Sequence, residues 1–139
     1  MKPQVVLVSD DKPTRQRLER GLSQSPLGPS VVALDWQQLQ KAPDLQPDLM
    51  ILDRQAHQGN VLEALYLLRQ RCVGPILVLG NGDTKNTLEM VAILEAGADF
   101  YLSPPFSHQV LLARIGVLLR RWDSSKPGFC APGDAMSTA

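Results

Sequence analysis

The stretch Val5-Val6-Leu7-Val8-Ser9-Asp10-Asp11 decides the fold, because a continuous apolar run ends there in two carboxylates. An uninterrupted, β-branched run is typical of a strand that helices cover on both faces, as in a parallel sheet. A second apolar run, Asp48-Leu49-Met50-Ile51-Leu52-Asp53, ends in a third carboxylate. Ligand sites of open α/β sheets lie at the carboxyl ends of the strands. We therefore expect Asp10, Asp11 and Asp53 to share one pocket.

The rest of the chain alternates short β-rich runs with helical patterns. Further strands are expected at 31–34, 76–79 and 100–102. Helices are expected between and after the strands, at about 12–22, 36–41, 61–68, 86–96 and 107–121. Five strands and five helices in alternating order predict an α/β fold, with a parallel sheet between two layers of helices.

Length and composition limit the kind of protein this can be. The 139 residues are enough for one domain with a buried core, and the net charge of zero provides no basic field for nucleic acid or membranes. Cys72 and Cys130 do not indicate a disulfide framework, which suits a reducing cytosol. The apolar runs are strand-length and no signal-peptide pattern opens the chain, so we expect a cytoplasmic protein without a membrane segment. The composition after Trp122 predicts a folded domain over 1–122 and a linker or flexible tail over 123–139.

Four strings, in this order and at this spacing, resemble the receiver domain of two-component response regulators. They are VLVSDD (6–11), PDLMILD (47–53), PILVL (75–79) and LEAGADFYLSPPF (94–106). The last helix is similar to that of the OmpR/PhoB class in particular. The resemblance implies a flavodoxin-like (βα)5 fold, a doubly wound parallel sheet with strand order 2-1-3-4-5. It also implies a signalling domain that is not an enzyme.

The resemblance assigns roles to the three strand-end acids. Asp53 matches the phosphoacceptor, and Asp10 and Asp11 match the acids that hold Mg²⁺ together with Asp53 and the backbone of Gln55. Mg²⁺ prefers a few carboxylates together with water and phosphate oxygens, so the residue types suit such a site. No cofactor is required by this interpretation, and Mg²⁺ is the ion that the acids could hold. The plainer alternative is that the strand-end aspartates only cap helices.

Two substitutions remove the side chains that bind the phosphoryl group in this family. Gly80 stands where strand four should end in Thr or Ser, and Pro104 stands where a Lys should precede proline. Tyr101 matches the aromatic switch position, but the hydroxyl that it would follow is missing at Gly80. Lys85 and Thr84, in the next loop, could substitute. Without a lysine beside three acids, mutual repulsion should raise at least one carboxyl pKa.

The resemblance also implies a dimer surface, formed by the fourth helix, the fifth strand and the fifth helix. Ala92 and Val110 stand where the family places an ion pair across the two-fold axis, so we expect a more apolar, constitutive interface. The alternative is that these apolar side chains only pad the surface of a monomer. The residues assigned to the interface are Glu89, Ala92, Ile93, Asp99, Phe100, Val110, Arg114 and Arg121.

Together these patterns predict an atypical, phosphorylation-independent receiver domain of an OmpR/PhoB-class transcription factor that acts as a homodimer. It would reach DNA only through an output domain that these residues lack, and it could receive signals from a sensor kinase or another signalling protein. One alternative is a conventional phosphoacceptor receiver that uses Asp53 with Mg²⁺. Another is a stand-alone adaptor that binds a protein partner. A flavodoxin-like enzyme or nucleotide binder is disfavoured, because no glycine-rich loop follows the first strand.

Overall fold

Five parallel strands form the centre of the molecule, in the predicted order β2-β1-β3-β4-β5. The computed structural model describes residues 3–25, 28–41, 45–80 and 87–121, without the side chains of Thr87 and Arg121. The strands are β1 (Gln4–Val8), β2 (Ser30–Leu34), β3 (Leu49–Asp53), β4 (Ile76–Leu79) and β5 (Phe100–Leu102). The helices are α1 (Lys12–Ser23), α2 (Trp36–Gln40), the 3₁₀ turn η1 (Ala56–Gly59), α3 (Val61–Arg69), α4 (Thr87–Glu95) and α5 (His108–Arg121). The predicted flavodoxin-like fold is confirmed.

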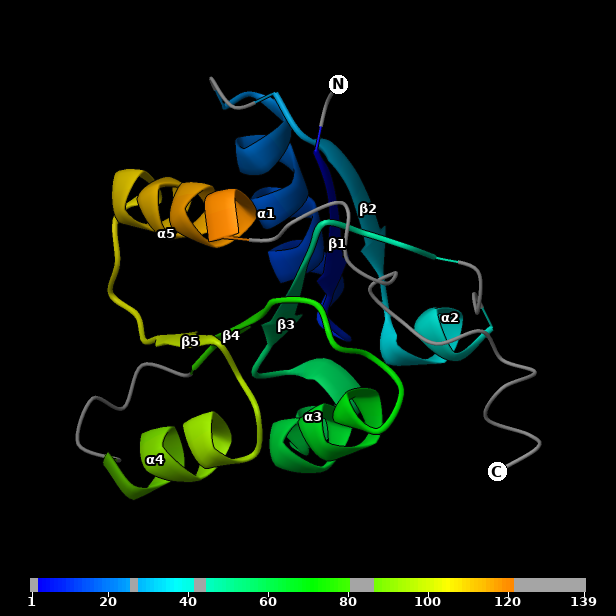
Figure 1. Cartoon of the computed structure of the whole chain (residues 1–139). Helices are drawn as coiled ribbons and strands as arrows, with labels where there is room; N and C mark the ends of the chain where they lie inside the picture. Colours follow the sequence, from blue (N-terminus) through cyan, green and yellow to red (C-terminus); the bar gives the residue numbers. More distant parts are fainter. Residues whose placement is uncertain (1–2, 26–27, 42–44, 81–86, 122–139) are drawn as a thin grey trace.

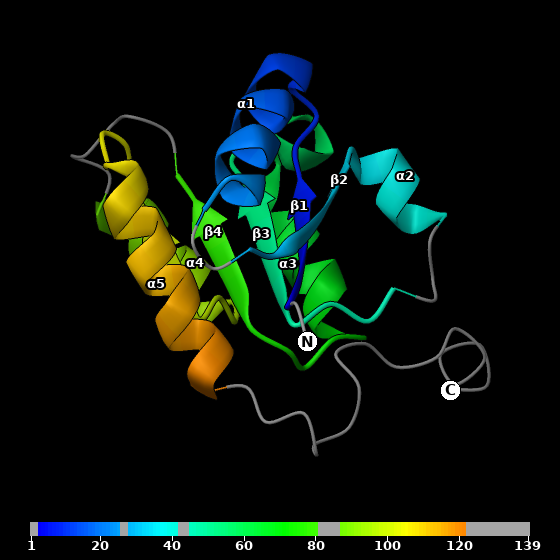
Figure 2. The ribbon, with the colours of Figure 1, turned by 90° about the horizontal axis from the view of Figure 1, so that it is seen from above.

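Helices cover both faces of the sheet and make two separate apolar cores. Helices α1 and α5 lie on one face, and α2, α3 and α4 lie on the other (Figures 1 and 2). Alternate residues of each strand enter the two cores, as Val6 and Leu7 do in β1. All four residues of β4 and the last four of β1 are buried. Both faces of these strands are covered, which explains why their sequences are continuously apolar.

Helix starts follow the capping residues that the sequence offers. The Asp11 carboxylate accepts a hydrogen bond from the Thr14 backbone N–H at 3.2 Å and so caps α1. The Ser107 hydroxyl accepts one from the Val110 N–H at 3.1 Å, just before α5, as predicted. Such caps satisfy backbone donors that have no partner inside the helix and typically stabilise it by about 1 kcal/mol. They also fix where each helix leaves the edge of the sheet.

Arg69 joins the end of α3 to the starts of β4 and β5. Its guanidinium donates to the Gly97 carbonyl at 2.7 Å and to the Gly74 carbonyl at 2.6 Å, and it forms an ion pair with Asp99 at 2.5 Å. Gly97 has the predicted positive φ, +118°, and a β-carbon there would lie 2.8 Å from Arg69 Cγ. The sequence assigned Asp99 to a dimer surface, whereas its carboxylate is engaged inside the chain and also accepts from the Ile76 N–H at 2.8 Å.

Three further features bear on the sequence predictions. The Pro104–Pro105 peptide bond is cis, as expected. Cys72 is 2% exposed and disulfide-bonded, which does not fit the expected reducing cytosol. No helix among the described ranges is long and apolar enough to cross a membrane. Thr84, Lys85, Cys130 and the predicted tail, 123–139, lie outside the described residues.

Candidate functional site

Asp53 sits at the carboxyl end of β3 and is almost buried, with 7% of its surface exposed. The parallel register places Val8 opposite Leu52, so the residue after β1, Ser9, lies beside Asp53. The buried Ser9 hydroxyl donates to Asp53 Oδ2 at 2.8 Å, and the Gln55 N–H donates to the same oxygen at 3.3 Å. One carboxylate oxygen of Asp53 is therefore held by the protein itself.

Burial raises the pKa of Asp53 above its ordinary value. The hydrogen bonds from Ser9 and from the backbone of Gln55 and Arg54 oppose this rise, and the negative charge of Asp11 adds to it. The sequence predicted a raised carboxyl pKa from mutual repulsion. The direction is confirmed for Asp53, but removal from water is the main cause and repulsion a minor one.

Asp10 turns away from Asp53, which corrects the expectation that three acids share one pocket. Its Oδ1 accepts from the Trp36 N–H at 2.9 Å and its Oδ2 accepts from the Gln58 N–H at 2.8 Å. It lines a second pocket together with Asp35, Trp36, Gln37, His57 and Gln58. Asp10 therefore ties α2 to η1, where His57 and Gln58 adopt left-handed conformations with φ of 55° and 57°.

The donors around Asp53 do not fit the magnesium site that the resemblance implies. Asp11 caps α1 and also accepts from the Thr14 hydroxyl, and the Gln55 carbonyl accepts from the Asp10 N–H at 3.3 Å. Within the described part of the chain, no group of three acidic, histidine or cysteine side chains is arranged to hold a metal ion. Mg²⁺ demands near-octahedral oxygen ligands at short range. In the structure the two Asp10 oxygens accept backbone N–H groups, and Asp11 accepts from Thr14.

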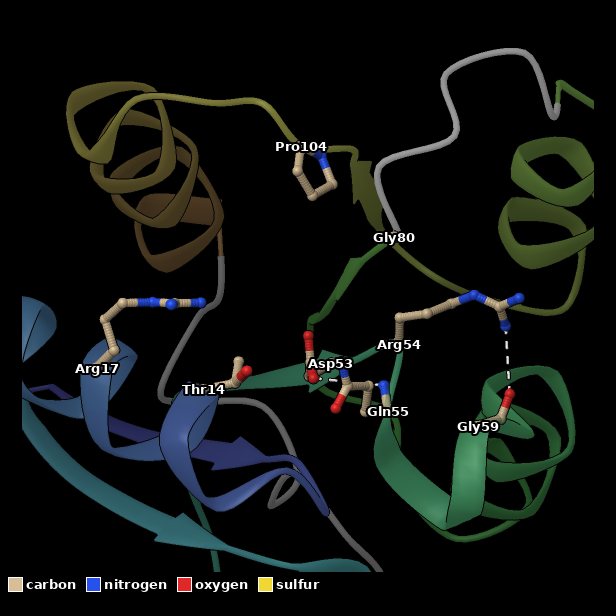
Figure 3. Close-up of a pocket in the computed structure, with 8 residues that line it drawn as sticks. All are labelled: Thr14, Arg17, Asp53, Arg54, Gln55, Gly59, Gly80 and Pro104. Carbon is tan, nitrogen blue, oxygen red and sulfur yellow. Dashed lines mark hydrogen bonds between the residues drawn. The ribbon is translucent and has the colours of Figure 1, made fainter.

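A pocket of about 460 Å³ opens in front of Asp53 (Figure 3). Arg54 enters it from the end of β3, but its side chain extends away from Asp53, donating to the Gly59 carbonyl at 3.2 Å. Arg54 Nε also lies 3.0 Å from Glu89 Oε1 on α4, as an ion pair that is poorly aligned for a hydrogen bond. Among the described residues no cation pairs with Asp53. The pocket is lined by Thr14, Arg17, Asp53, Arg54, Gln55, Gly59, Gly80 and Pro104.

Tyr101 fills the space that the missing side chain of Gly80 leaves open. β4 and β5 pair with Val78 opposite Tyr101, and the Gly80 N–H donates to the Leu102 carbonyl at 2.8 Å. A β-carbon on Gly80 would overlap the Tyr101 hydroxyl oxygen and Cζ, and would lie 3.0 Å from Cε2. From the sequence, Tyr101 had no hydroxyl at position 80 to follow; in the structure its own hydroxyl lies against Gly80.

The residues assigned to the dimer surface do not all reach a surface. Ile93 is 1% exposed and belongs to the core, so it cannot contribute to an interface. Glu89 faces Arg54, and Ala92 lines a groove between α3 and α4. Phe100 is partly buried beneath the Arg114 guanidinium, which lies 4.6 Å from the ring centre. The assigned residues that stand out to solvent are Asp99, Val110 and Arg114, and the side chain of Arg121 is outside the described set.

Sequence reasoning missed several residues that shape the site. Ser9 was read only as part of a motif, although a polar residue at the end of a buried strand was a signal for a contact with the next strand. The Arg54–Glu89 ion pair joins the loop after β3 to α4, 35 residues further along the chain. No pattern among neighbouring residues predicts this pair. Exposed apolar side chains of α4 were also missed: Leu88 (83%), Val91 (41%) and Leu94 (39%).

Proteins similar in sequence to this chain are response regulators. No family model matches the chain. Response regulator MprA of Mycobacterium leprae is 38% identical over 134 residues, covering 96% of this chain and 57% of that protein. Response regulator MprA of Mycobacterium tuberculosis (strain H37Rv) is 36% identical over 137 residues, covering 98% and 57%. The chain thus spans 57% of the length of these curated relatives.

Solved structures agree with these relatives. The receiver domain of the TMAO respiratory system response regulator TorR is 28% identical with a TM-score of 0.74, covering 87% of this chain and 99% of that one. The BeF3-activated N-terminal receiver domain of Klebsiella pneumoniae RstA is 25% identical with a TM-score of 0.74, covering 85% and 99%.

Proposed function

The chain is a receiver domain of the response regulator family, of the OmpR/PhoB class, and from that premise we propose that it acts without phosphorylation. It is a signalling domain, and under this proposal it carries no catalytic activity of its own. Its output is a constitutive homodimer. The domain would receive its signal from a partner protein rather than from the chemistry of a phosphoryl group on Asp53.

The position of Asp10 carries this proposal. Both of its carboxylate oxygens accept backbone N–H groups, from Trp36 and Gln58, at 2.9 and 2.8 Å. Recruiting Asp10 to a magnesium ion beside Asp53 would require breaking two charge-assisted hydrogen bonds, each of which is worth roughly 1–3 kcal/mol in proteins. A phosphoryl group on Asp53 would then lack the cation that offsets its charge.

Gly80 and Pro104 support the same conclusion from the other side of the pocket. Both line the pocket in front of Asp53, yet glycine provides no side-chain donor and proline provides neither a charge nor an N–H. In the family a hydroxyl and an ammonium at these positions would bind the phosphoryl oxygens. Their combined contribution would be about 2–4 kcal/mol, which is comparable to the free-energy gap of a typical two-state switch.

The proposed dimer uses the exposed surface of α4, β5 and α5. Val110 at the start of α5 is 42% exposed, and α4 exposes three apolar side chains. Arg114, stacked on Phe100, adds a cation to this surface. Burying apolar side chains in this way gains roughly 25 cal/mol for each Å² removed from water, without the geometric demands of an ion pair.

A two-domain transcription factor is the assembly in which such a dimer would act. DNA contact would come from an output domain in the part of the relatives that this chain does not span, and a sensor kinase or other signalling protein would be the upstream partner. We place the protein in the cytoplasm, and the disulfide at Cys72 is the observation that stands against this placement.

Sedimentation equilibrium with and without acetyl phosphate and Mg²⁺ tests the proposal. We expect a dimer in both conditions. Val110→Asp should shift the chain to monomer. Leu67→Asp should leave the dimer intact, because Leu67 is similarly exposed at 38% but lies on α3, outside the groove that Ala92 lines. A monomer in both conditions would reject the dimer, and a dimer that forms only with acetyl phosphate would reject phosphorylation independence.

A conventional phosphoacceptor role for Asp53 is the second candidate. The observation in its favour is that Asp53 still lines an open pocket of about 460 Å³. Intact-mass measurement after treatment with acetyl phosphate and Mg²⁺ separates the two candidates. Stoichiometric addition of a phosphoryl group that is lost in Asp53→Asn, together with a change in assembly, would favour this second function.

A further inference from the structure

Gly80, directly after β4, lies beside the tip of the Tyr101 side chain of β5. A β-carbon on Gly80 would overlap the phenol oxygen and Cζ, so any residue other than glycine would have to displace the ring. Thr or Ser, the residues expected here from the resemblance, would occupy that same space. The position of the Tyr101 ring therefore depends on the glycine.

The backbone at Gly80 does not itself require glycine. Three described glycines have positive φ, namely Gly28, Gly59 and Gly97, and Gly80 is not among them. Its N–H makes an ordinary strand hydrogen bond to the Leu102 carbonyl. An alanine could adopt this backbone without strain, since only positive φ penalises a β-carbon. What excludes a side chain at Gly80 is the tyrosine and not the chain conformation.

Tyr101 connects this gap to the α4 side of the sheet. The ring is partly buried and packs against the core that contains Ile93 of α4 and Leu65 of α3. A displaced ring would leave that core and become exposed to water at the surface near β5. A side chain at position 80 is therefore expected to decide whether the ring keeps this place.

We propose that Gly80 and Tyr101 form a lock that holds the β5 aromatic in its inward place in the absence of any ligand at Asp53. This inference rests on the proposed phosphorylation-independent function and specifies its regulation. The Tyr101 hydroxyl occupies the site at which a strand-four side chain would stand. The surface of α4, β5 and α5 is thereby fixed in one arrangement, and signals must change it by protein binding.

Tyrosine nitration in the ligand-free protein tests the lock. The chain contains two tyrosines, and Tyr66 on α3 is 61% exposed, so it serves as an internal standard. In the wild type, tetranitromethane should modify Tyr101 several-fold more slowly than Tyr66. In Gly80→Ala, Tyr101 should react at a rate close to that of Tyr66. Gly116→Ala is the matched control, because its nearest contact would be Arg120 at 3.5 Å.

A double-mutant cycle gives a second measurement that does not depend on nitration. Gly80→Ala should lower the urea midpoint of the wild type but leave that of Tyr101→Val unchanged or higher, since the ring is then gone. If Gly80→Ala alone fails to fold, the double variant should still fold. A double variant that fails too would overturn the lock.

Unchanged protection of Tyr101 in Gly80→Ala, with an unchanged urea midpoint, would also overturn the lock, whatever acetyl phosphate does. The expected Gly80→Ala result supports the lock even if acetyl phosphate changes the assembly. In that case only the proposed phosphorylation independence is rejected. The two failures are therefore distinguishable.

Discussion

Replacing Asp10 with alanine tests whether Asp10 stabilises the fold or serves as a magnesium ligand. The two roles predict opposite changes in the free energy of unfolding. In the structure the carboxylate accepts the first N–H of α2, from Trp36, and the N–H of Gln58 in the left-handed turn of η1. The substitution removes both acceptors at once. We expect Asp10→Ala to destabilise the folded chain in the absence of metal.

The magnitude follows from the contacts. Loss of a helix-capping acceptor costs about 0.5–2 kcal/mol. Loss of the second bond adds about 1 kcal/mol before solvent is considered. Asp10 is exposed, so water replaces part of both bonds and we expect a net loss of about 1–2 kcal/mol. For a domain of this size, that corresponds to a fall in melting temperature of roughly 3–8 °C.

The assay is urea unfolding in EDTA and again in excess Mg²⁺. We expect the same loss in both, because Asp10 binds backbone and not metal. Asp35→Ala is the matched control: Asp35 caps the same helix through Gln38 and is not one of the expected metal ligands, so it should show a similar loss in both conditions. If Asp10 belongs to a three-carboxylate metal site, Asp10→Ala should instead relieve repulsion, stabilise the chain in EDTA and abolish stabilisation by Mg²⁺. That result would refute the reasoning.

Three further predictions concern the ion pairs and the buried acid. Because burial raises the pKa of Asp53, the stability from its neutral form is complete below the ordinary pKa and is lost as the pH rises through the raised value. Asp53→Asn should therefore be more stable than wild type at pH 7 in urea unfolding, with an advantage that shrinks on acidification; an advantage that grows would contradict the sign. A double-mutant cycle with Arg54→Met and Glu89→Gln should give a coupling of about 0.5–1 kcal/mol for this partly buried pair, and no coupling would mean that the loop after β3 is not tied to α4. Arg69→Met should cost about 2–4 kcal/mol in urea unfolding, since a largely buried guanidinium loses three carbonyl bonds and an ion pair; a loss below about 1 kcal/mol would contradict this role of Arg69.

Strand identity and order could be predicted because the signals are local. The runs at β1, β3 and β4 are apolar on both faces, which only a sheet covered on both sides requires. Capping by Asp11 and Ser107 and the positive φ of Gly97 follow from a few neighbouring residues. The fold of the chain could therefore be predicted from its sequence.

The directions in which side chains point at the ends of the strands could not be predicted from the sequence. Asp10 and Asp11 are adjacent, but beyond the last strand residue the backbone is free to aim them differently, and donors in α2 and η1 decide the outcome for Asp10. The assignment of Ile93 to a surface failed because the apolar residues of α4 lie on several of its sides, so their pattern does not tell which face is buried.

The contact between Gly80 and Tyr101 needed the register of β4 and β5, which no single motif encodes. Once Val78 is paired with Tyr101, the glycine two residues later lies within reach of the phenol. A glycine directly after one strand, beside a neighbouring strand that carries an aromatic residue, is therefore a sequence signal for such a contact.

The most direct test of the central claim is the amide NMR spectrum of the ¹⁵N-labelled chain, recorded before and after addition of Mg²⁺ and beryllofluoride. We predict that the Gly80, Tyr101 and Leu102 amides keep their chemical shifts, because the inward ring and the lack of a complete magnesium site leave nothing to switch. Saturable shifts at these amides, with matching changes along α4, would contradict the account and establish an ordinary phosphate-driven receiver.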